Sequence, residues 1–119
     1  MKLRDAKTGK VILKNVVLAD SFLKRFKGLM LKSRPARSHG LLFAFRKKGR
    51  HSVHTCFMRF AIDLVYLDDN GRIVEIKENL CPWRFYRPKS GAKYLLELPA
   101  GDANIFGLHL GQQLKIEEK

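Results

Sequence analysis

The sequence predicts an α+β fold: a compact, bent and mostly antiparallel sheet or small β-barrel with little helix. Residues 62–68 are apolar apart from an aspartate near each end, which is typical of a strand buried on both faces. An Asn-Gly pair at 70–71 follows and is a strong hairpin signal. Residues 72–79 then alternate, with Val74 and Ile76 on one face, so we expect this segment to pair antiparallel with 62–68.

The N-terminal part contains a predicted hairpin and the main predicted helix. Residues 2–6 and 10–18 flank a Lys-Thr-Gly turn at 7–9, and the second arm is rich in β-branched residues. Phenylalanines and leucines then recur at helical spacing behind an Asp-Ser pair at 20–21, which suits a helix N-cap. These features predict a helix near residues 21–30.

The remaining elements are short. Residues 40–45 predict a buried strand, and residues 52–58 predict another strand or an extended arm. Residues 93–98 predict a strand whose alternate positions share one apolar face: Tyr94, Leu96 and Leu98. Asp102 at the start and Gly107 just beyond the end frame a short second helix near residues 102–106. Residues 113–116 predict the last strand.

Length and composition point to one domain, which we assign to residues 1–119. A chain of this size folds without a metal or a disulfide, and two cysteines, Cys56 and Cys81, do not make a disulfide framework. No apolar run approaches the roughly 18 residues of a membrane span, and the N-terminal residues lead into no signal-peptide core. We therefore expect a cytoplasmic protein with no membrane partner and no cofactor.

The charge is the least ordinary feature of the chain. It has 24 Lys and Arg against 11 Asp and Glu, a formal net charge of +13. No acidic residue occurs from Ser21 to Ile62, whereas eleven basic ones do: Lys24, Arg25, Lys27, Lys32, Arg34, Arg37, Arg46, Lys47, Lys48, Arg50 and Arg59. Such a field attracts polyanions. The alternative is that these cations only keep a thermally robust protein soluble.

A long loop at 81–92 combines aromatic and basic side chains without any periodicity. Aromatic rings stack on unpaired bases, and Arg and Lys hold phosphates. The sequence thus predicts a nucleic-acid site formed by Arg46, Lys47, Lys48, Arg50, Trp83, Arg84, Tyr86 and Arg87. The alternative is that the aromatic rings tuck into the fold as a lid while the cations are solvated.

Catalytic and metal-binding signals are weak. His51, His54 and Cys56 offer two ligands on one strand face and one on the other, so we expect no metal site. Asp63 and His54 are the candidate catalytic residues, because a carboxylate inside an apolar strand needs a partner. The structural interpretation is that Asp63 accepts backbone N–H bonds or pairs with an arginine. No phosphate-binding glycine motif or nucleophile elbow is present.

Several blocks are spaced as in a known family: Gly28-Leu29-Met30, Gly40-Leu41-Leu42-Phe43, His54-Thr55-Cys56-Phe57-Met58, Ile62-Asp63-Leu64-Val65-Tyr66-Leu67-Asp68 and Glu97-Leu98-Pro99-Ala100-Gly101, with Gly107 and Gly111. They resemble the domain of unknown function 192 family, also called uncharacterised protein family 0127, over nearly the whole chain. His51 and His54 are similar to its archaeal-type members. The resemblance implies a compact, mainly β domain with one or two helices, and it implies no activity.

Three functions remain open at this point. The first is a small basic module that binds RNA or single-stranded DNA. The second is a ligand-binding protein or enzyme with a pocket near His54, Asp63 and the loop at 81–92. The third is an accessory domain that binds another protein through an exposed apolar patch.

Overall fold

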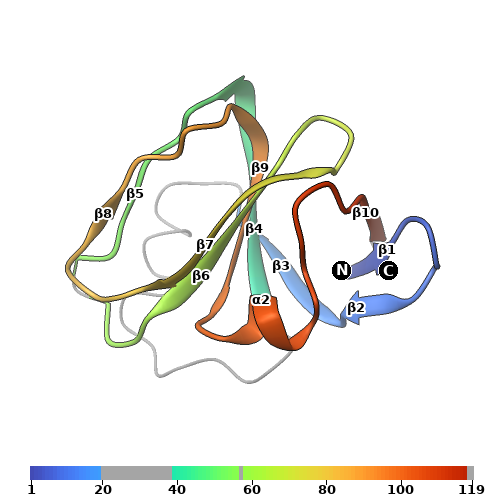
Figure 1. The fold of residues 1–119 in the computed structure, drawn as a ribbon, viewed down its shortest axis with the longest axis horizontal. Coiled ribbons are helices and arrows are strands. Elements are labelled where there is room, and N and C mark those ends of the chain that lie inside the picture. Colours follow the sequence, from blue (N-terminus) through green and yellow to red (C-terminus); the bar gives the residue numbers. More distant parts are fainter. Residues whose placement is uncertain (20–38, 57, 118–119) are drawn as a thin grey trace.

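The computed structural model describes residues 1–19, 39–56 and 58–117. Its centre is a five-stranded sheet of order β3-β4-β9-β6-β7 (Figure 1). The strands are β3 (Asn15–Ala19), β4 (His39–Gly49), β9 (Ala92–Pro99), β6 (Ile62–Leu67) and β7 (Ile73–Leu80). β3 and β4 run parallel, and the other neighbours are antiparallel. All six residues of β6 are buried, which confirms the prediction of a strand covered on both faces.

Two smaller sheets and one helix complete the described fold. A three-stranded sheet has the order β10-β1-β2, formed by β1 (Lys2–Asp5), β2 (Val11–Leu13) and β10 (Leu114–Glu117). A two-stranded sheet pairs β5 (Val53–His54) with β8 (Phe85–Tyr86). Figure 1 shows these two sheets on opposite sides of the central one. The helix α2 (Asp102–Ile105) confirms the predicted short helix.

The central sheet separates two apolar clusters. Alternate residues of β6 enter different clusters, Val65 and Leu67 on one face and Leu64 and Tyr66 on the other. The first cluster is completed by residues of the three-stranded sheet: Leu3, Leu13 and Leu114. The second is covered in part by Val53 and Tyr86 of the two-stranded sheet. The face that Tyr94, Leu96 and Leu98 were predicted to share is confirmed, since all three belong to the first cluster.

The predicted fold class needs a correction. The described residues are predominantly β with one short helix, and they form open sheets rather than a closed barrel. Part of the difference from the predicted barrel lies in the segment 10–18, which was predicted as a single strand. It divides at Lys14, so that β2 pairs with β1 while β3 pairs with β4.

The helix predicted near 21–30 lies outside the described residues. Among the described helices, none has the length and apolarity to cross a membrane.

A β-bulge changes the predicted faces of β7. Tyr66 pairs with Glu75 and Leu67 pairs with Ile73, so Val74 is the extra residue on its strand. Val74 therefore packs in the second cluster and Ile76 in the first. The prediction that these two side chains share a face was wrong, because strict alternation holds only where the ladder has no inserted residue.

The predicted hairpin turn between β6 and β7 is confirmed, and it also holds the C-terminal strand. Gly71 adopts φ +81°, and a Cβ there would lie 2.4 Å from the carbonyl oxygen of Leu114. The Leu114 N–H donates to the Gly71 carbonyl at 2.8 Å. Only glycine allows this close approach in this backbone conformation.

Candidate functional site

The two-stranded sheet is part of a longer projection, residues 50–56 and 81–90, which we call the arm. Thr55 is fully buried and joins its two segments. The Thr55 N–H donates to the Arg84 carbonyl at 2.9 Å, and the Trp83 N–H donates to the Thr55 carbonyl at 3.0 Å. The Thr55 hydroxyl donates to the Cys81 carbonyl at 2.6 Å and accepts from the Arg84 N–H at 2.9 Å. Thr55 therefore joins the two segments through both its backbone and its hydroxyl.

The basic turn at 46–50 lies beside the end of the 81–92 loop. The Arg50 Nε donates to the Pro88 carbonyl at 2.9 Å. Gly49 and Ala92 are strand partners. The Lys93 ammonium donates to the Arg46 carbonyl at 2.9 Å. The structure thus brings together two basic segments that the sequence could only treat separately.

Glu75 of β7 anchors the inner side of the arm. Its carboxylate accepts a hydrogen bond from the Tyr86 hydroxyl and two from the N–H groups of Lys89 and Ser90, at 2.9 and 2.8 Å. Burial, then the hydrogen bond to Glu75 and its charge, raise the pKa of Tyr86 to about 12. Burial opposes ionisation of Glu75, but the hydrogen bonds that it accepts hold its pKa below the usual value.

Tyr86 consequently faces the body of the protein. Its ring centre lies 6.3 Å from that of Tyr66, and it packs against the second apolar cluster. The Lys77 ammonium lies 6.0 Å from the centre of the Tyr86 ring. Tyr86 thus tucks into the fold as a lid, which is the alternative considered for the aromatic rings of this loop. The exposed aromatic rings of the arm are other residues.

Two large rings of the arm, Phe85 and Trp83, are exposed to solvent. His54 and Phe85 are direct strand partners and therefore point to the same side, where Phe85 is 68% exposed. Trp83 is 57% exposed and has a left-handed backbone, φ +62°. The neighbouring cations are also exposed: Arg46, Lys47, Lys48, Arg50, Arg84, Arg87 and Lys89. The ranges 39–56, 58–62 and 81–96 contain no acidic residue.

The predicted catalytic residues occupy different surroundings. Asp63 is fully buried in β6. Its carboxylate accepts the N–H groups of Asn79 at 2.8 Å and of Gly101 and Ala103 at 3.0 Å each. This confirms the structural interpretation of Asp63. His54 is exposed on β5, and no contact within the described ranges joins it to Asp63. A catalytic role for either residue stays a prediction.

The metal candidates do not converge in the described part of the chain. The His51 ring stacks on Phe45 with 3.6 Å between ring centres, and its Nε2 lies 2.9 Å from the Lys47 carbonyl. Across residues 1–19, 39–56 and 58–117, no three His, Cys, Asp or Glu side chains are grouped as metal ligands. The absence of zinc stays a prediction.

Sequence reasoning missed Thr55 and Glu75. The alternation of residues 72–79 gave Glu75 no special role, and nothing in the local pattern marked Thr55. Both act through pairing partners distant in sequence, and the polar run at 88–90 opposite Glu75 gave no local signal. Of the eleven basic residues between Ser21 and Ile62, six lie outside the described residues.

Comparison with known proteins agrees with the resemblance noted in the sequence. The model of the DUF192 family, described as uncharacterized ACR, matches residues 2–116. A UPF0127 protein of Thermococcus sibiricus is 39% identical over 115 residues, which cover 93% of this chain and 73% of that protein. A UPF0127 protein of Pyrococcus furiosus is 40% identical over 109 residues, 90% of each chain.

Two crystal structures have similar folds. A Sinorhizobium meliloti protein, named as a candidate transcription regulator, gives a TM-score of 0.82 at 27% identity, covering 96% of this chain and 89% of that one. A Novosphingobium aromaticivorans protein of unknown function gives 0.81 at 17% identity, covering 97% and 82%. The second likeness concerns the fold alone. From the family match and the archaeal relatives together, the chain belongs to the DUF192 family as an archaeal-type member.

Proposed function

We propose that the protein binds single-stranded nucleic acid, RNA or DNA, on the outer face of the arm and the adjoining turn at 46–50. One observation supports this most directly. The Arg50 to Pro88 hydrogen bond and the Gly49–Ala92 pairing hold two acid-free basic segments side by side. The arm also carries two exposed aromatic rings, Trp83 and Phe85.

The cations of this surface suit a phosphate backbone. Each is exposed, and each ammonium or guanidinium that contacts a phosphate releases counterions, which makes binding depend on salt. Arg50 differs from its neighbours because its guanidinium also ties the turn to the arm. Arg46, Lys47 and Lys48 therefore test charge alone, whereas a substitution of Arg50 also disturbs the local structure.

The exposed rings favour unpaired bases over a duplex. A base stacks on an aromatic face only when that face of the base is free, and each such contact contributes about 1–3 kcal/mol. Phe85 and Trp83 are exposed rings, whereas Tyr86 is turned inward. The name given to the Sinorhizobium meliloti protein is in line with a nucleic-acid partner.

The test is fluorescence anisotropy with one labelled sequence as single-stranded RNA, single-stranded DNA and duplex DNA, across a salt series. We expect micromolar affinity for the single strands at physiological salt and weaker binding to the duplex. The logarithm of the binding constant should fall with the logarithm of the salt concentration, with a slope of about −0.7 for each phosphate neutralised. Changing Arg46, Lys47 and Lys48 to Ser should flatten the slope by about 2 units. Phe85→Ala and Trp83→Ala should each weaken single-strand binding by about 1–3 kcal/mol.

The matched control removes the same charge from the far side of the molecule. Lys7, Lys10 and Lys115 belong to the β1–β2 turn and β10, and all three are exposed. Changing them to Ser should leave the salt slope almost unaltered. An equal flattening by the control would show diffuse charge attraction and contradict an interface on the arm. An absence of binding at low salt would contradict the proposal altogether.

A further inference from the structure

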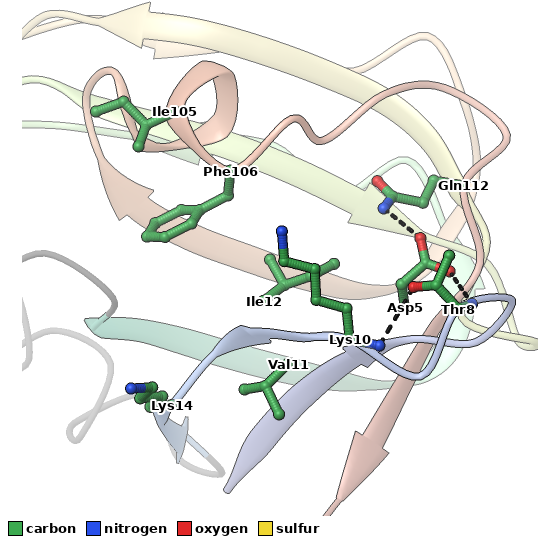
Figure 2. Close-up of a pocket in the computed structure, with 9 residues that line it drawn as sticks. All are labelled: Asp5, Thr8, Lys10, Val11, Ile12, Lys14, Ile105, Phe106 and Gln112. Atoms are coloured by element: carbon green, nitrogen blue, oxygen red, sulfur yellow. Dashed lines mark hydrogen bonds between the residues drawn. The ribbon is translucent and has the colours of Figure 1, made fainter.

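A hollow of about 500 Å³ lies on the other side of the molecule, between the β1–β2 hairpin and the helix α2. Its lining includes Lys10, Lys14, Ile12, Ile105, Phe106 and Gln112. Figure 2 shows the Lys10 ammonium directed between Phe106 and Gln112, with Ile12 beneath it. The hollow has the size of ordinary small-molecule sites, which combine an apolar lining with a few polar groups.

The apolar part of the hollow is exposed to solvent. Ile105 is 52% exposed although it is a large aliphatic residue in a helix of four residues. Phe106 and Ile12 are partly buried and pack against the first apolar cluster from the side of the hollow. Their positions are thus fixed by the core, and their outer surfaces remain available to the apolar body of a ligand.

A rigid polar wall closes the end of the hollow near the turn at 7–9. The Gln112 Nε2 donates to Asp5 Oδ2 at 2.8 Å, and the N–H groups of Lys7 and Thr8 donate to Asp5 Oδ1 at 2.8 and 3.0 Å. The hydrogen bond from Gln112, followed by that from Thr8, lowers the pKa of Asp5 below its ordinary value. The carboxylate is thus occupied by donors of the protein itself.

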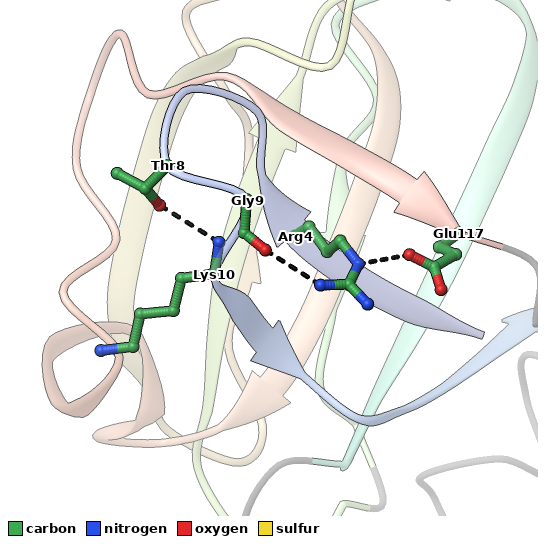
Figure 3. A network of polar contacts seen from close by, with 5 residues as sticks. All are labelled: Arg4, Thr8, Gly9, Lys10 and Glu117. Carbon is green, nitrogen blue, oxygen red and sulfur yellow. Dashed lines mark hydrogen bonds and ion pairs between the residues drawn. The ribbon is translucent and has the colours of Figure 1, made fainter.

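The hairpin that presents Lys10 is also held in place. The Arg4 Nη1 donates to the Gly9 carbonyl at 2.9 Å, and the Lys10 N–H donates to the Thr8 hydroxyl at 3.2 Å (Figure 3). Arg4 also forms an ion pair with Glu117 of β10. Within the described ranges, neither the Lys10 nor the Lys14 ammonium has an ion-pair or hydrogen-bond partner of its own. The hollow therefore combines an apolar floor with two cations and one carboxylate, that of Asp5, whose oxygens already accept donors of the protein.

We propose that this hollow binds a small organic anion with an apolar body, a carboxylate or a phosphate monoester on an alkyl or aryl group. The anionic end lies at the Lys10 ammonium. The apolar body covers Ile12, Ile105 and Phe106. This site is separate from the arm, since the two lie on opposite sides of the central sheet.

The test is a titration of the ¹⁵N-labelled protein, followed by amide chemical shifts, with octanoate, octyl phosphate and neutral octanol. We expect saturable shifts concentrated at Lys10, Ile12, Ile105 and Phe106. Both anions should bind about tenfold or more tightly than octanol, since hydrogen bonds to charged groups contribute about that factor. Comparing octanoate with octyl phosphate distinguishes a carboxylate site from a phosphate site.

Two exposed substitutions test the two parts of the site. Lys10→Gln should weaken octanoate binding about tenfold with little effect on octanol, and Ile105→Ser should weaken both probes. Lys115→Gln on β10, an exposed lysine that does not line the hollow, is the matched control and should change neither. Equal affinity for octanol and octanoate, no effect of Lys10→Gln, or shifts spread evenly over surface lysines would each overturn the proposal. Nucleic-acid binding by the Lys10→Gln variant should be unchanged, which separates this site from the proposed function.

Discussion

Replacing Asp63 by Ala should unfold the protein more easily because it removes one acceptor that serves three donors. The Ala103 N–H is buried, so its loss of a partner costs about 1–3 kcal/mol. The hydrogen bonds from the Asn79 and Gly101 N–H groups are only partly buried, so water can replace the carboxylate more easily there. Their contribution is about 0.5 kcal/mol each, at the low end for a hydrogen bond. The three contributions add to about 2–4 kcal/mol, most of which comes from the one buried donor.

Guanidinium chloride denaturation, followed by far-UV circular dichroism, measures this change. The midpoint should fall with an unchanged m-value, since the surface exposed on unfolding stays the same. Asp63→Asn should cost only about 1–2 kcal/mol, because its oxygen still accepts from Gly101 and Ala103 while its amide faces the Asn79 N–H.

Asp68 supplies the matched control for Asp63. Its carboxylate also accepts backbone donors, the N–H groups of Asn70 and Arg72 at 2.9 Å each, but in a solvent-exposed turn. Asp68→Ala should therefore cost no more than about 1 kcal/mol. An unchanged midpoint for Asp63→Ala, or equal losses for Asp63→Ala and Asp68→Ala, would refute the argument from buried donors.

The remaining predictions concern the arm. The raised pKa of Tyr86 gives stability that is complete below the unfolded value near 10 and is lost as the pH rises towards about 12, so alkaline unfolding of Tyr86→Phe should lack this component. The lowered pKa of Glu75 gives stability that is present above the unfolded carboxyl pKa and is lost as the pH falls through the folded value; Glu75→Gln should flatten acid unfolding there. Thr55→Val should lower the global free energy of unfolding by no more than about 2 kcal/mol, whereas hydrogen exchange at the amides of Trp83 and Arg84 should accelerate. Normal protection of these amides would contradict the role given to Thr55.

Local patterns predicted those parts of the fold that depend on neighbours in sequence. The apolar run of β6, the turn before β7 and the short α2 follow from composition and turn chemistry within a few residues. The division at Lys14 and the bulge at Val74 did not follow, because each depends on which distant strand lies alongside. A single inserted residue reverses the faces beyond it, and no local signal marks such an insertion.

The candidate site shows the same limit. The residue types of the 81–92 loop predicted aromatic and basic chemistry, but the direction of each ring depends on its partner in β5. Tyr86 opposes Val53 and faces inward, whereas Phe85 opposes His54 and faces outward. The hollow beside Lys10 was not predicted either, since its two walls are about a hundred residues apart in the chain.

The pairing of β1 with β10 has a kinetic consequence. Lys2 lies opposite Glu117, so the first strand pairs with β10 only when two segments far apart in the chain come together. Until then β1 has only β2 beside it, and an isolated two-stranded hairpin is marginally stable in water. Closing so long a loop raises the entropic barrier, which places refolding on the millisecond-to-second scale typical of sheets with distant contacts. The three-stranded sheet should therefore be the last part of the protein to acquire protection in a refolding experiment, after the neighbouring β6 and β7 have paired.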